Sequence, residues 1–473
     1  MNKYVFPLKY NDIPKYIQIA DRIKKLMDNN EIEDGEKLPS IRKLSLELNV
    51  NCITIVNAYK KLQNEGYAVQ KIGSGTYAKR KDFKKNFKRE YSEEIKKING
   101  EKLKEYIDFS GEAACSDIFE VETFKNVLNE VLERDGIDAL IYQEALGYEG
   151  LRESIDKYFW NGDVGACNIL IISGAQQGID VVAKALINVN DNVIIEKPTY
   201  SGALAVFKWR RANIFEVPVE YDGIDLEKFE KIVKKNKIKC FYTMSYFQNP
   251  TGISYCHDKK EALLKLAEKY DFYIIEDDYL SELIYDDKIK YESFKSLDRN
   301  DRVIYIKSFS KIFLPGIRIG YMICPLKFKE SIQNSKVNTD ISTSSLMQRA
   351  LELYIRKGYW KEHIDKLNRT YKGRYYYINS CMKNLFNDKA SFKSPGGGLN
   401  FYLKIDDGIL LNSMQLFNEC KSSKILITPG VLFYKNASDG DKFFRLGFSQ
   451  TEDDKIYKGI FAISKILEGH KKI

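Results

Sequence analysis

The chain has 473 residues, 44% of them hydrophobic and 13% aromatic, so it can bury a sizeable core, and its length predicts two or three domains. Its eight cysteines form no Cys-x-x-Cys pair and it has three histidines, which argues against a disulfide framework and against a metal site. The formal net charge of +9 favours a polyanionic partner, whereas the absence of a signal-peptide segment and of any apolar run of about 18 residues indicates a cytoplasmic protein without a membrane span.

The first eighty residues have the pattern of a DNA-binding domain. A helix with apolar residues at helical spacing is predicted after Pro14, and a turn then leads to two further helices, IRKLSLELNV and CITIVNAYKKLQNEGY. Two strands around a Gly-Ser-Gly turn are predicted in AVQKIGSGTYAKR. Helix, helix, turn, helix and a hairpin wing form the architecture that places one helix in a major groove. The alternative is a helical adaptor for protein contacts.

This stretch, from about residue 14 to residue 79, resembles the winged helix-turn-helix domain of the GntR family. The resemblance rests on LPSIRKLSLELNVNCITIVNAYKKLQNEGY followed by GSGTY. It implies that the partner is double-stranded promoter or operator DNA, and that Arg42 contacts a phosphate or a base edge. It also implies that Asn51 and Thr54 lie at the groove end of the recognition helix, and that Gly75 lets the wing approach the minor groove. Many members carry Ser-Arg where this chain has Asn51-Cys52, so its affinity or base preference is expected to differ.

A basic stretch separates this part from the rest of the chain. Residues 79–105 contain 11 Lys or Arg against 6 Asp or Glu. We interpret the stretch as a solvated, partly helical linker, with contact to the phosphate backbone as a second possibility. The predicted domains are therefore a DNA-binding domain at 1–78, a linker at 79–105 and a large domain at 106–473.

The large domain alternates short apolar strands with amphipathic helices. Strands with unbroken apolar runs are buried on both faces, which predicts an α/β fold with a mainly parallel sheet, flanking helices and a smaller α/β subdomain. In such sheets the ligand lies beyond the carboxyl ends of the strands. Polar motifs follow five of the predicted strands: GAQQG, KPTYSG, QNPTG, DDY and SFSK.

Two of these strand ends bring an acid and a lysine onto neighbouring strands. Asp277 ends IIEDDY, and the next strand delivers Lys311 with hydroxyl groups and an arginine around it. This set suits a cofactor with an aldehyde, a basic ring nitrogen and a phosphate, and pyridoxal phosphate has all three. The lysine would form a Schiff base, and the carboxylate would hold the ring proton.

Residues 106–473 resemble the fold-type I aminotransferases, with GAQQG, PTYSG, NPTG, EDDY, SFSKIFLPGIRIG and FRLGF in the family's order. The resemblance implies that Lys311 is the Schiff-base lysine, that Asp277 pairs with the ring nitrogen, and that Arg445 clamps a ligand carboxylate. It also implies that Asn249 and Tyr279 contact the ring oxygen and that Tyr200 stacks on the ring face. The phosphate would be bound by Ala175, Gln176, Ser308, Ser310 and Arg318. Tyr142 would reach the phosphate in the neighbouring subunit.

The two parts together resemble the MocR/GabR family of transcription regulators. That resemblance implies a head-to-tail homodimer and a small amine, amino acid or pyridoxal phosphate itself as the effector that changes promoter binding. The alternatives are an active aminotransferase that also binds DNA and an adaptor protein with a degenerate site. Retention of the lysine and of its partners argues against the adaptor.

Overall fold

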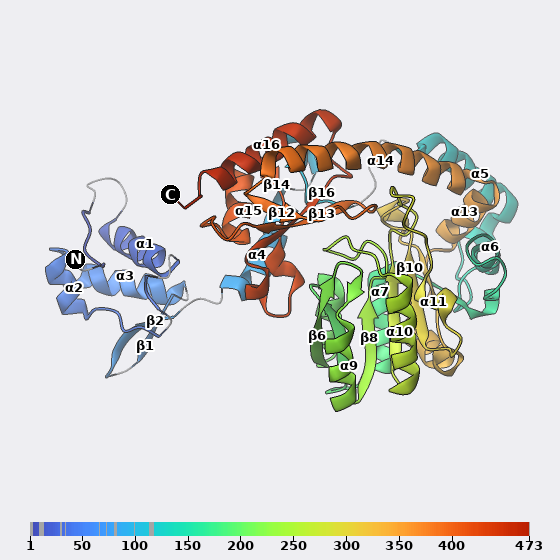
Figure 1. Ribbon diagram of the computed structural model, residues 1–473, viewed down its shortest axis with the longest axis horizontal. Helices are drawn as coiled ribbons and strands as arrows, with labels where there is room; N and C mark the ends of the chain where they lie inside the picture. The colour runs from blue at the N-terminus through green and yellow to red at the C-terminus, as the bar shows by residue number, and fades with distance from the viewer. Residues whose placement is uncertain are drawn as a thin grey trace. The chain divides into compact units, whose positions relative to one another are not determined.

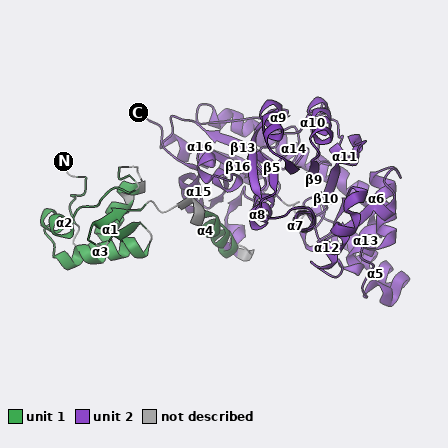
Figure 2. Ribbon diagram, turned by 90° about the horizontal axis from the view of Figure 1, so that it is seen from below, with its two compact units in different colours: residues 1–97 green, residues 98–473 purple. Residues whose placement is uncertain are grey.

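The structure is a computed structural model, and its described residues are 3–8, 14–28, 31–33, 35–65, 67–71, 73–79, 83–98, 100–112 and 118–472. The chain divides into two compact units, residues 1–97 and 98–473 (Figure 2). The division falls inside the stretch that the sequence predicted as a linker, where residues 83–98 form a helix. The described helices include none that is long and apolar enough to cross a bilayer.

The described part of the N-terminal unit contains three helices, a hairpin and a fourth helix: α1 (Lys15–Asp28), α2 (Ile41–Glu47), α3 (Cys52–Asn64), β1 (Ala68–Lys71), β2 (Gly75–Ala78) and α4 (Phe83–Ile98). Helix α2 begins after Ser40, whose hydroxyl accepts a hydrogen bond from Lys43 N at 3.3 Å. Helices α1, α2 and α3 bury their apolar sides in one core, which includes Ile19, Leu26, Leu44, Ile55 and Leu62. The predicted helix-turn-helix with its hairpin is confirmed.

In the described part of the second unit, eight strands form one sheet (Figure 1). Its order is β4 (Ile169–Ile172), β11 (Gly320–Ile323), β10 (Val303–Ser308), β9 (Tyr273–Asp278), β8 (Ile238–Thr243), β5 (Asn192–Lys197), β6 (Asn213–Glu220) and β7 (Gly223–Ile224). The run from β10 to β6 is parallel, and β11 and β7 pair antiparallel with their neighbours. The mainly parallel sheet is as predicted.

Alternation along β9 sends adjacent side chains to opposite faces of this sheet. Ile274 lies in a core with side chains of α9 (Leu226–Lys235), α10 (His257–Lys269) and α11 (Phe294–Leu297). Asp277 lies three residues further on and therefore faces the other side. It is in register with Ile306, which packs near α7 (Ala175–Leu186). The side chains of Asp277 and Asp278 therefore lie on opposite faces of the sheet.

A smaller antiparallel sheet forms the subdomain, with the order β12 (Ala390–Phe392), β13 (Asn400–Ile405), β16 (Phe443–Gly447) and β15 (Thr428–Pro429). The long helix α14 (Tyr359–Phe386) lies beside α16 (Asp453–Glu468), which also contacts α15 (Ser413–Ser422) (Figure 1). A short parallel pair joins β3 (Ile107–Asp108) to β14 (Ile425–Leu426). Arg445 is on β16, so this subdomain brings it to the site.

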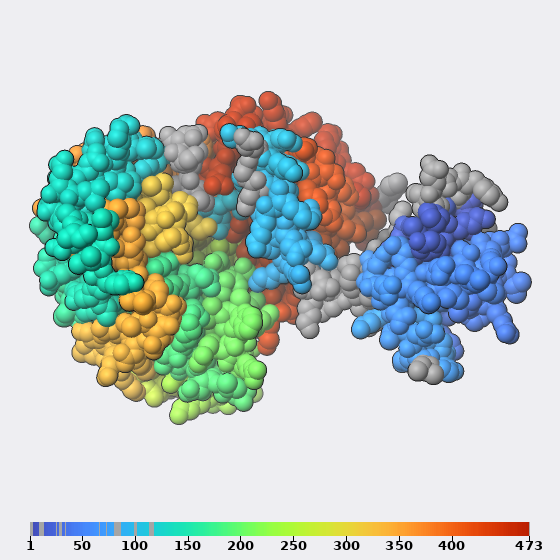
Figure 3. Space-filling model, turned by 180° about the vertical axis from the view of Figure 1, so that it is seen from behind, coloured from blue at the N-terminus to red at the C-terminus, as the bar shows by residue number. Residues whose placement is uncertain are grey.

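The remaining helices of the second unit pack against one another in two groups. Helices α5 (Val121–Asp135) and α6 (Glu149–Phe159) pack against α13 (Ser345–Arg356), and their teal residues lie beside the orange segment in Figure 3. Helices α8 (Ser201–Trp209) and α12 (Lys329–Val337) both contact α7. Helix α7 is thereby held with its first turn beyond the carboxyl end of β4.

Candidate functional site

The predicted strand-end residues come together in one pocket of about 110 Å³. It is lined by Ala175, Gln176, Tyr200, Met244, Asn249, Asp277, Tyr279, Ser308, Ser310, Lys311 and Arg318. All of these except Met244 were singled out from the sequence. They converge because the carboxyl ends of the parallel strands meet at one edge of the sheet. Two larger surface hollows, of about 490 and 680 Å³, have none of these residues in their lining.

Asp277 is the most unusual group in this pocket. It is 2% exposed, and its Oδ2 accepts a hydrogen bond from the hydroxyl of Tyr242 at 2.7 Å. Its Oδ1 is buried and has no hydrogen-bond partner among the described residues. Loss of hydration raises the pKa of Asp277 to about 7, because burial disfavours the charged carboxylate. A cationic N–H donor on a ligand would satisfy the free oxygen and restore the charge.

An anion subsite lies at the first turn of α7. Gly174 precedes the helix with φ +92°, and a Cβ there would lie 3.0 Å from Nη2 of Arg318. Arg318 Nη2 donates to Ser173 O at 2.7 Å, and Nη1 lies 3.4 Å from the Ser310 hydroxyl. Binding of a phosphate is favoured where the free N–H groups of a helix N-terminus lie beside a guanidinium and hydroxyl groups.

Lys311 follows β10 and is accessible, with its side chain 37% exposed. Its Nζ lies 3.7 Å from Oε2 of Glu112. Nearby, the Tyr200 hydroxyl lies 3.2 Å from Gln176 Oε1, and burial raises the pKa of Tyr200 to about 12, so the phenol stays neutral. An accessible amine thus lies at the pocket beside neutral hydroxyls.

Tyr279 and Asn249 were both predicted to contact a ring oxygen. In the structure the Tyr279 hydroxyl donates to Phe247 O at 2.7 Å. Asn249 Nδ2 donates to Glu112 Oε2 at 3.1 Å. Both residues line the pocket, but each already has a protein partner.

Arg445 is paired with an acid that sequence reasoning missed. Its Nη1 lies 2.5 Å from Glu112 Oε1 and 2.9 Å from Asn249 Oδ1. Its Nη2 donates to Ser110 O at 2.9 Å and to Thr428 Oγ1 at 3.2 Å. The guanidinium is therefore already neutralised by the protein. No motif signalled this pairing, because the two residues come from distant segments of the chain.

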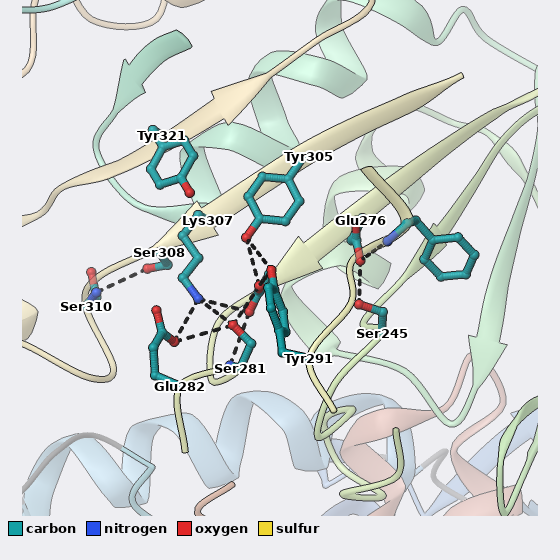
Figure 4. A network of polar contacts seen from close by, with 12 residues as sticks. Ser245, Glu276, Ser281, Glu282, Tyr291, Tyr305, Lys307, Ser308, Ser310 and Tyr321 are labelled. Carbon is teal, nitrogen blue, oxygen red and sulfur yellow. Dashed lines mark hydrogen bonds and ion pairs between the residues drawn. The ribbon is translucent and has the colours of Figure 1, made fainter. Parts of the chain in front are cut away.

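A second network, on the opposite face of β9 and β10, fixes the ends of these strands (Figure 4). Lys307 Nζ donates to Asp278 Oδ1 at 3.1 Å and to Glu282 Oε2 at 2.8 Å. Two hydroxyls donate to Asp278 Oδ2, at 2.7 and 2.8 Å, from Tyr291 and Tyr305. Burial disfavours the charge of Asp278, but Lys307 and these donors lower its pKa. The network ties the strand carrying Asp277 to the strand leading to Lys311.

Tyr142 is 76% exposed and does not line the pocket of its own chain. It lies in the surface hollow of about 680 Å³ with Leu140, Ile141 and Ser345. Leu140 and Ile141 are 62% and 51% exposed, so this stretch presents apolar side chains to solvent. The expected contact of Tyr142 with a neighbouring subunit stays a prediction.

The residues predicted to meet DNA lie on α2, at the start of α3 and on β2. Asn51 is the N-cap of this helix, and its Oδ1 accepts a hydrogen bond from Ile53 N at 2.9 Å. Asn51 and Arg42 are exposed, and Thr54 is half-buried. Gly75 opens β2 with φ +117°, in the left-handed region that favours glycine. The capping role of Asn51 was not predicted.

Comparison with known proteins links both units to described families. Residues 111–463 match the family "Aminotransferase class I and II", and residues 15–78 match "Bacterial regulatory proteins, gntR family". The uncharacterized HTH-type transcriptional regulator YcxD of Bacillus subtilis (strain 168) is 30% identical over 465 residues, which cover 96% of this chain and 99% of that protein. The HTH-type transcriptional regulator NorG of Staphylococcus aureus (strain USA300) is 28% identical over 449 residues, covering 90% and 98%.

A solved aminotransferase has the same fold as the second unit. The crystal structure of Pyrococcus horikoshii kynurenine aminotransferase in complex with PMP, KYN as substrates and KYA as products superposes with a TM-score of 0.76 at 29% identity. The match covers 81% of this chain and 95% of that one.

Proposed function

We propose that this chain senses a small amine through pyridoxal phosphate and changes its promoter binding in response. The chain belongs to the GntR/MocR-type transcriptional regulators with an aminotransferase class I and II domain. In this proposal residues 1–78 read DNA, residues 79–105 link the two parts, and residues 106–473 form the sensor. The family membership supports the DNA-binding part. The pocket geometry supports the cofactor part.

The free oxygen of Asp277 is the observation that carries the cofactor proposal. A buried acceptor without a donor fits the protonated ring nitrogen of pyridoxal phosphate, which would also offset the unfavourable burial of the carboxylate. The first turn of α7 with Arg318, Ser308 and Ser310 fits the phosphate group. The residues present therefore match the charged ends of the cofactor.

The residues around the pocket would each have a different role toward the bound cofactor. When bound, pyridoxal phosphate supplies an aldehyde carbon that a primary amine can join as a Schiff base. Lys311 offers one such amine, and a ligand amine would compete with it. Asp277 would keep the proton on the ring nitrogen, and the neutral phenol of Tyr200 would cover the ring face.

Sensing requires that the ligand bind one arrangement of the protein more tightly than another. We propose that the protein acts as a head-to-tail homodimer in which Tyr142 reaches the neighbouring subunit's phosphate. The exposed apolar stretch around Tyr142 supports such an interface. A change in the dimer would then alter the spacing of two DNA-binding units on two half-sites.

The alternative is an active aminotransferase with an appended DNA-binding domain, because the same lysine serves both. Steady-state turnover with amino donors and keto acids separates the two. We expect turnover far below the range of about 1–10³ s⁻¹ typical of enzymes. Turnover within that range would favour the enzyme.

We predict distinct effects for substitutions in the DNA-binding unit. Arg42→Ala should weaken binding to all sequences alike and reduce the dependence of log affinity on log salt by about one unit, because a phosphate contact is lost. Thr54→Ala should instead change the preferred bases. The measurement is selection from a random DNA library, followed by titration at several salt concentrations.

Asn51 needs a control, because it also caps α3. Asn51→Ser keeps a capping hydroxyl and removes the amide, so a change in base preference then reports on readout. Deletion of residues 1–78 should abolish specific binding. Specific binding that survives this deletion would contradict the assignment.

A further inference from the structure

Glu112 holds the position in which a ligand carboxylate would meet Arg445. The two side chains are 6% and 7% exposed, and Glu112 Oε1 lies 2.5 Å from Arg445 Nη1. The other oxygen, Oε2, accepts from Asn249 Nδ2 at 3.1 Å and lies 3.7 Å from Lys311 Nζ. One protein carboxylate thus contacts Arg445, which was predicted to bind a ligand carboxylate, and also Asn249 and Lys311, which were predicted to bind the cofactor.

Packing against β16 holds the backbone before Glu112 in place. Phe109 is fully buried, and its carbonyl oxygen accepts a hydrogen bond from Gly447 N at 2.7 Å. A Cβ on Gly447 would lie 2.2 Å from Gly111 O, so the two backbones touch. Gly447 ends β16, the strand of Arg445. The packing therefore keeps the Glu112 and Arg445 backbones together.

We infer that Glu112 makes this pocket selective for primary amines without a carboxylate on the amine-bearing carbon. The inference rests on the proposed function, since it concerns the ligand of the same pocket. An amine with an uncharged tail leaves the pair of Glu112 and Arg445 intact. An α-amino acid brings a second carboxylate to one guanidinium, and the two anions repel in a buried site. The positive charge of an incoming amine also suits the negative group beside Lys311.

Butylamine and norvaline test this, because they differ only by the α-carboxylate. The full-length protein is loaded with pyridoxal phosphate, and the dissociation constant of each ligand is read from the visible absorption of the bound cofactor. We expect the parent to bind butylamine about a hundredfold more tightly than norvaline. Tighter binding of norvaline by the parent would overturn the inference. If neither these two ligands nor any other primary amine alters the absorption, the proposed function itself is wrong.

Glu112→Gln removes the competing charge and keeps the shape. It should strengthen norvaline binding at least tenfold and leave butylamine binding unchanged or weaker. The double variant Glu112→Gln/Arg445→Gln should lose that gain. A gain that persists in the double variant would show that Arg445 is not the partner and would overturn the inference.

A cofactor-free measurement checks the same pair by stability. Glu112→Gln leaves Arg445 buried without its counter-charge, so the variant should melt at a lower temperature than the parent. Propionate should raise the melting temperature of the variant and not that of the parent, because only in the variant does Arg445 lack a carboxylate counter-charge. Equal effects of propionate on both proteins would contradict the inference. If the variant does not fold, the parent's preference between butylamine and norvaline tests the inference instead.

Discussion

Lys311→Ala should abolish the covalent attachment of pyridoxal phosphate while leaving DNA binding intact. Lys311 is the amine among the residues that line the pocket, and its side chain is accessible. The buried Lys307 cannot replace it, because its ammonium is held by Asp278 and Glu282 on the other face of the sheet. The measurement is reduction with borohydride followed by peptide mapping, which should label Lys311 in the parent and no peptide in the variant.

A matched control for this variant is Lys265→Ala, which removes a lysine that is 76% exposed on α10. It should keep full labelling and the full response to amines. Labelling of a different lysine in the parent, or unchanged labelling in Lys311→Ala, would refute the assignment of Lys311.

Asp277→Asn should weaken cofactor binding by about ten- to a hundredfold, because a hydrogen bond between charged groups is lost. The same change should make the cofactor-free protein more stable at pH 8. Burial raises the pKa of Asp277 from 3.8 to about 7, and this shift corresponds to a cost on the order of 4 kcal/mol for the ionised group. Asparagine carries no charge and avoids that cost.

The direction of the pH dependence follows from the raised pKa. The folded protein holds the Asp277 proton more tightly than the unfolded chain, so its contribution to stability is full below about pH 4 and is lost as the pH rises through about 7. The free energy of unfolding should therefore differ little between variant and parent at pH 4, and it should be larger for the variant than for the parent at pH 8. Denaturant titrations of both cofactor-free proteins at the two pH values measure this.

Glu276→Gln is the control for the effect on the cofactor. Burial also raises the pKa of Glu276 to about 7, but its carboxylate accepts hydrogen bonds from Ser245 and from the backbone of Phe294. It is one residue before Asp277 and faces away from the pocket. The substitution should leave cofactor affinity within a few-fold. An equal loss of affinity in both variants would show that the effect of Asp277→Asn is general.

The strand ends could be predicted because each is a local pattern. A buried apolar run followed by a polar turn places Asp277 at the rim of a parallel sheet, and the same rule applies to Ser308. The helix-turn-helix was predictable for the same reason, since its helices, turns and wing follow one another in order.

Contacts between distant segments left no such pattern. The pairing of Glu112 with Arg445 depends on how residues 107–112 pack beside β16. The burial of Lys307 against Asp278 depends on the register of two strands. Sequence reasoning therefore identified Arg445 but not the acid that already neutralises it. Helix α4 lies inside the stretch predicted to be a partly helical linker, and its bounds could not be predicted because its sequence is dominated by charge.

In the proposed function, the aminotransferase-like unit controls DNA binding through an amine. The most direct test is the affinity of the cofactor-loaded, full-length protein for DNA that it selects from a random library, titrated with a panel of primary amines. We predict that at least one amine changes the affinity or the footprint of the parent, and that Lys311→Ala binds the same DNA without responding. A Lys311→Ala variant that responds as the parent does would contradict amine sensing through Lys311.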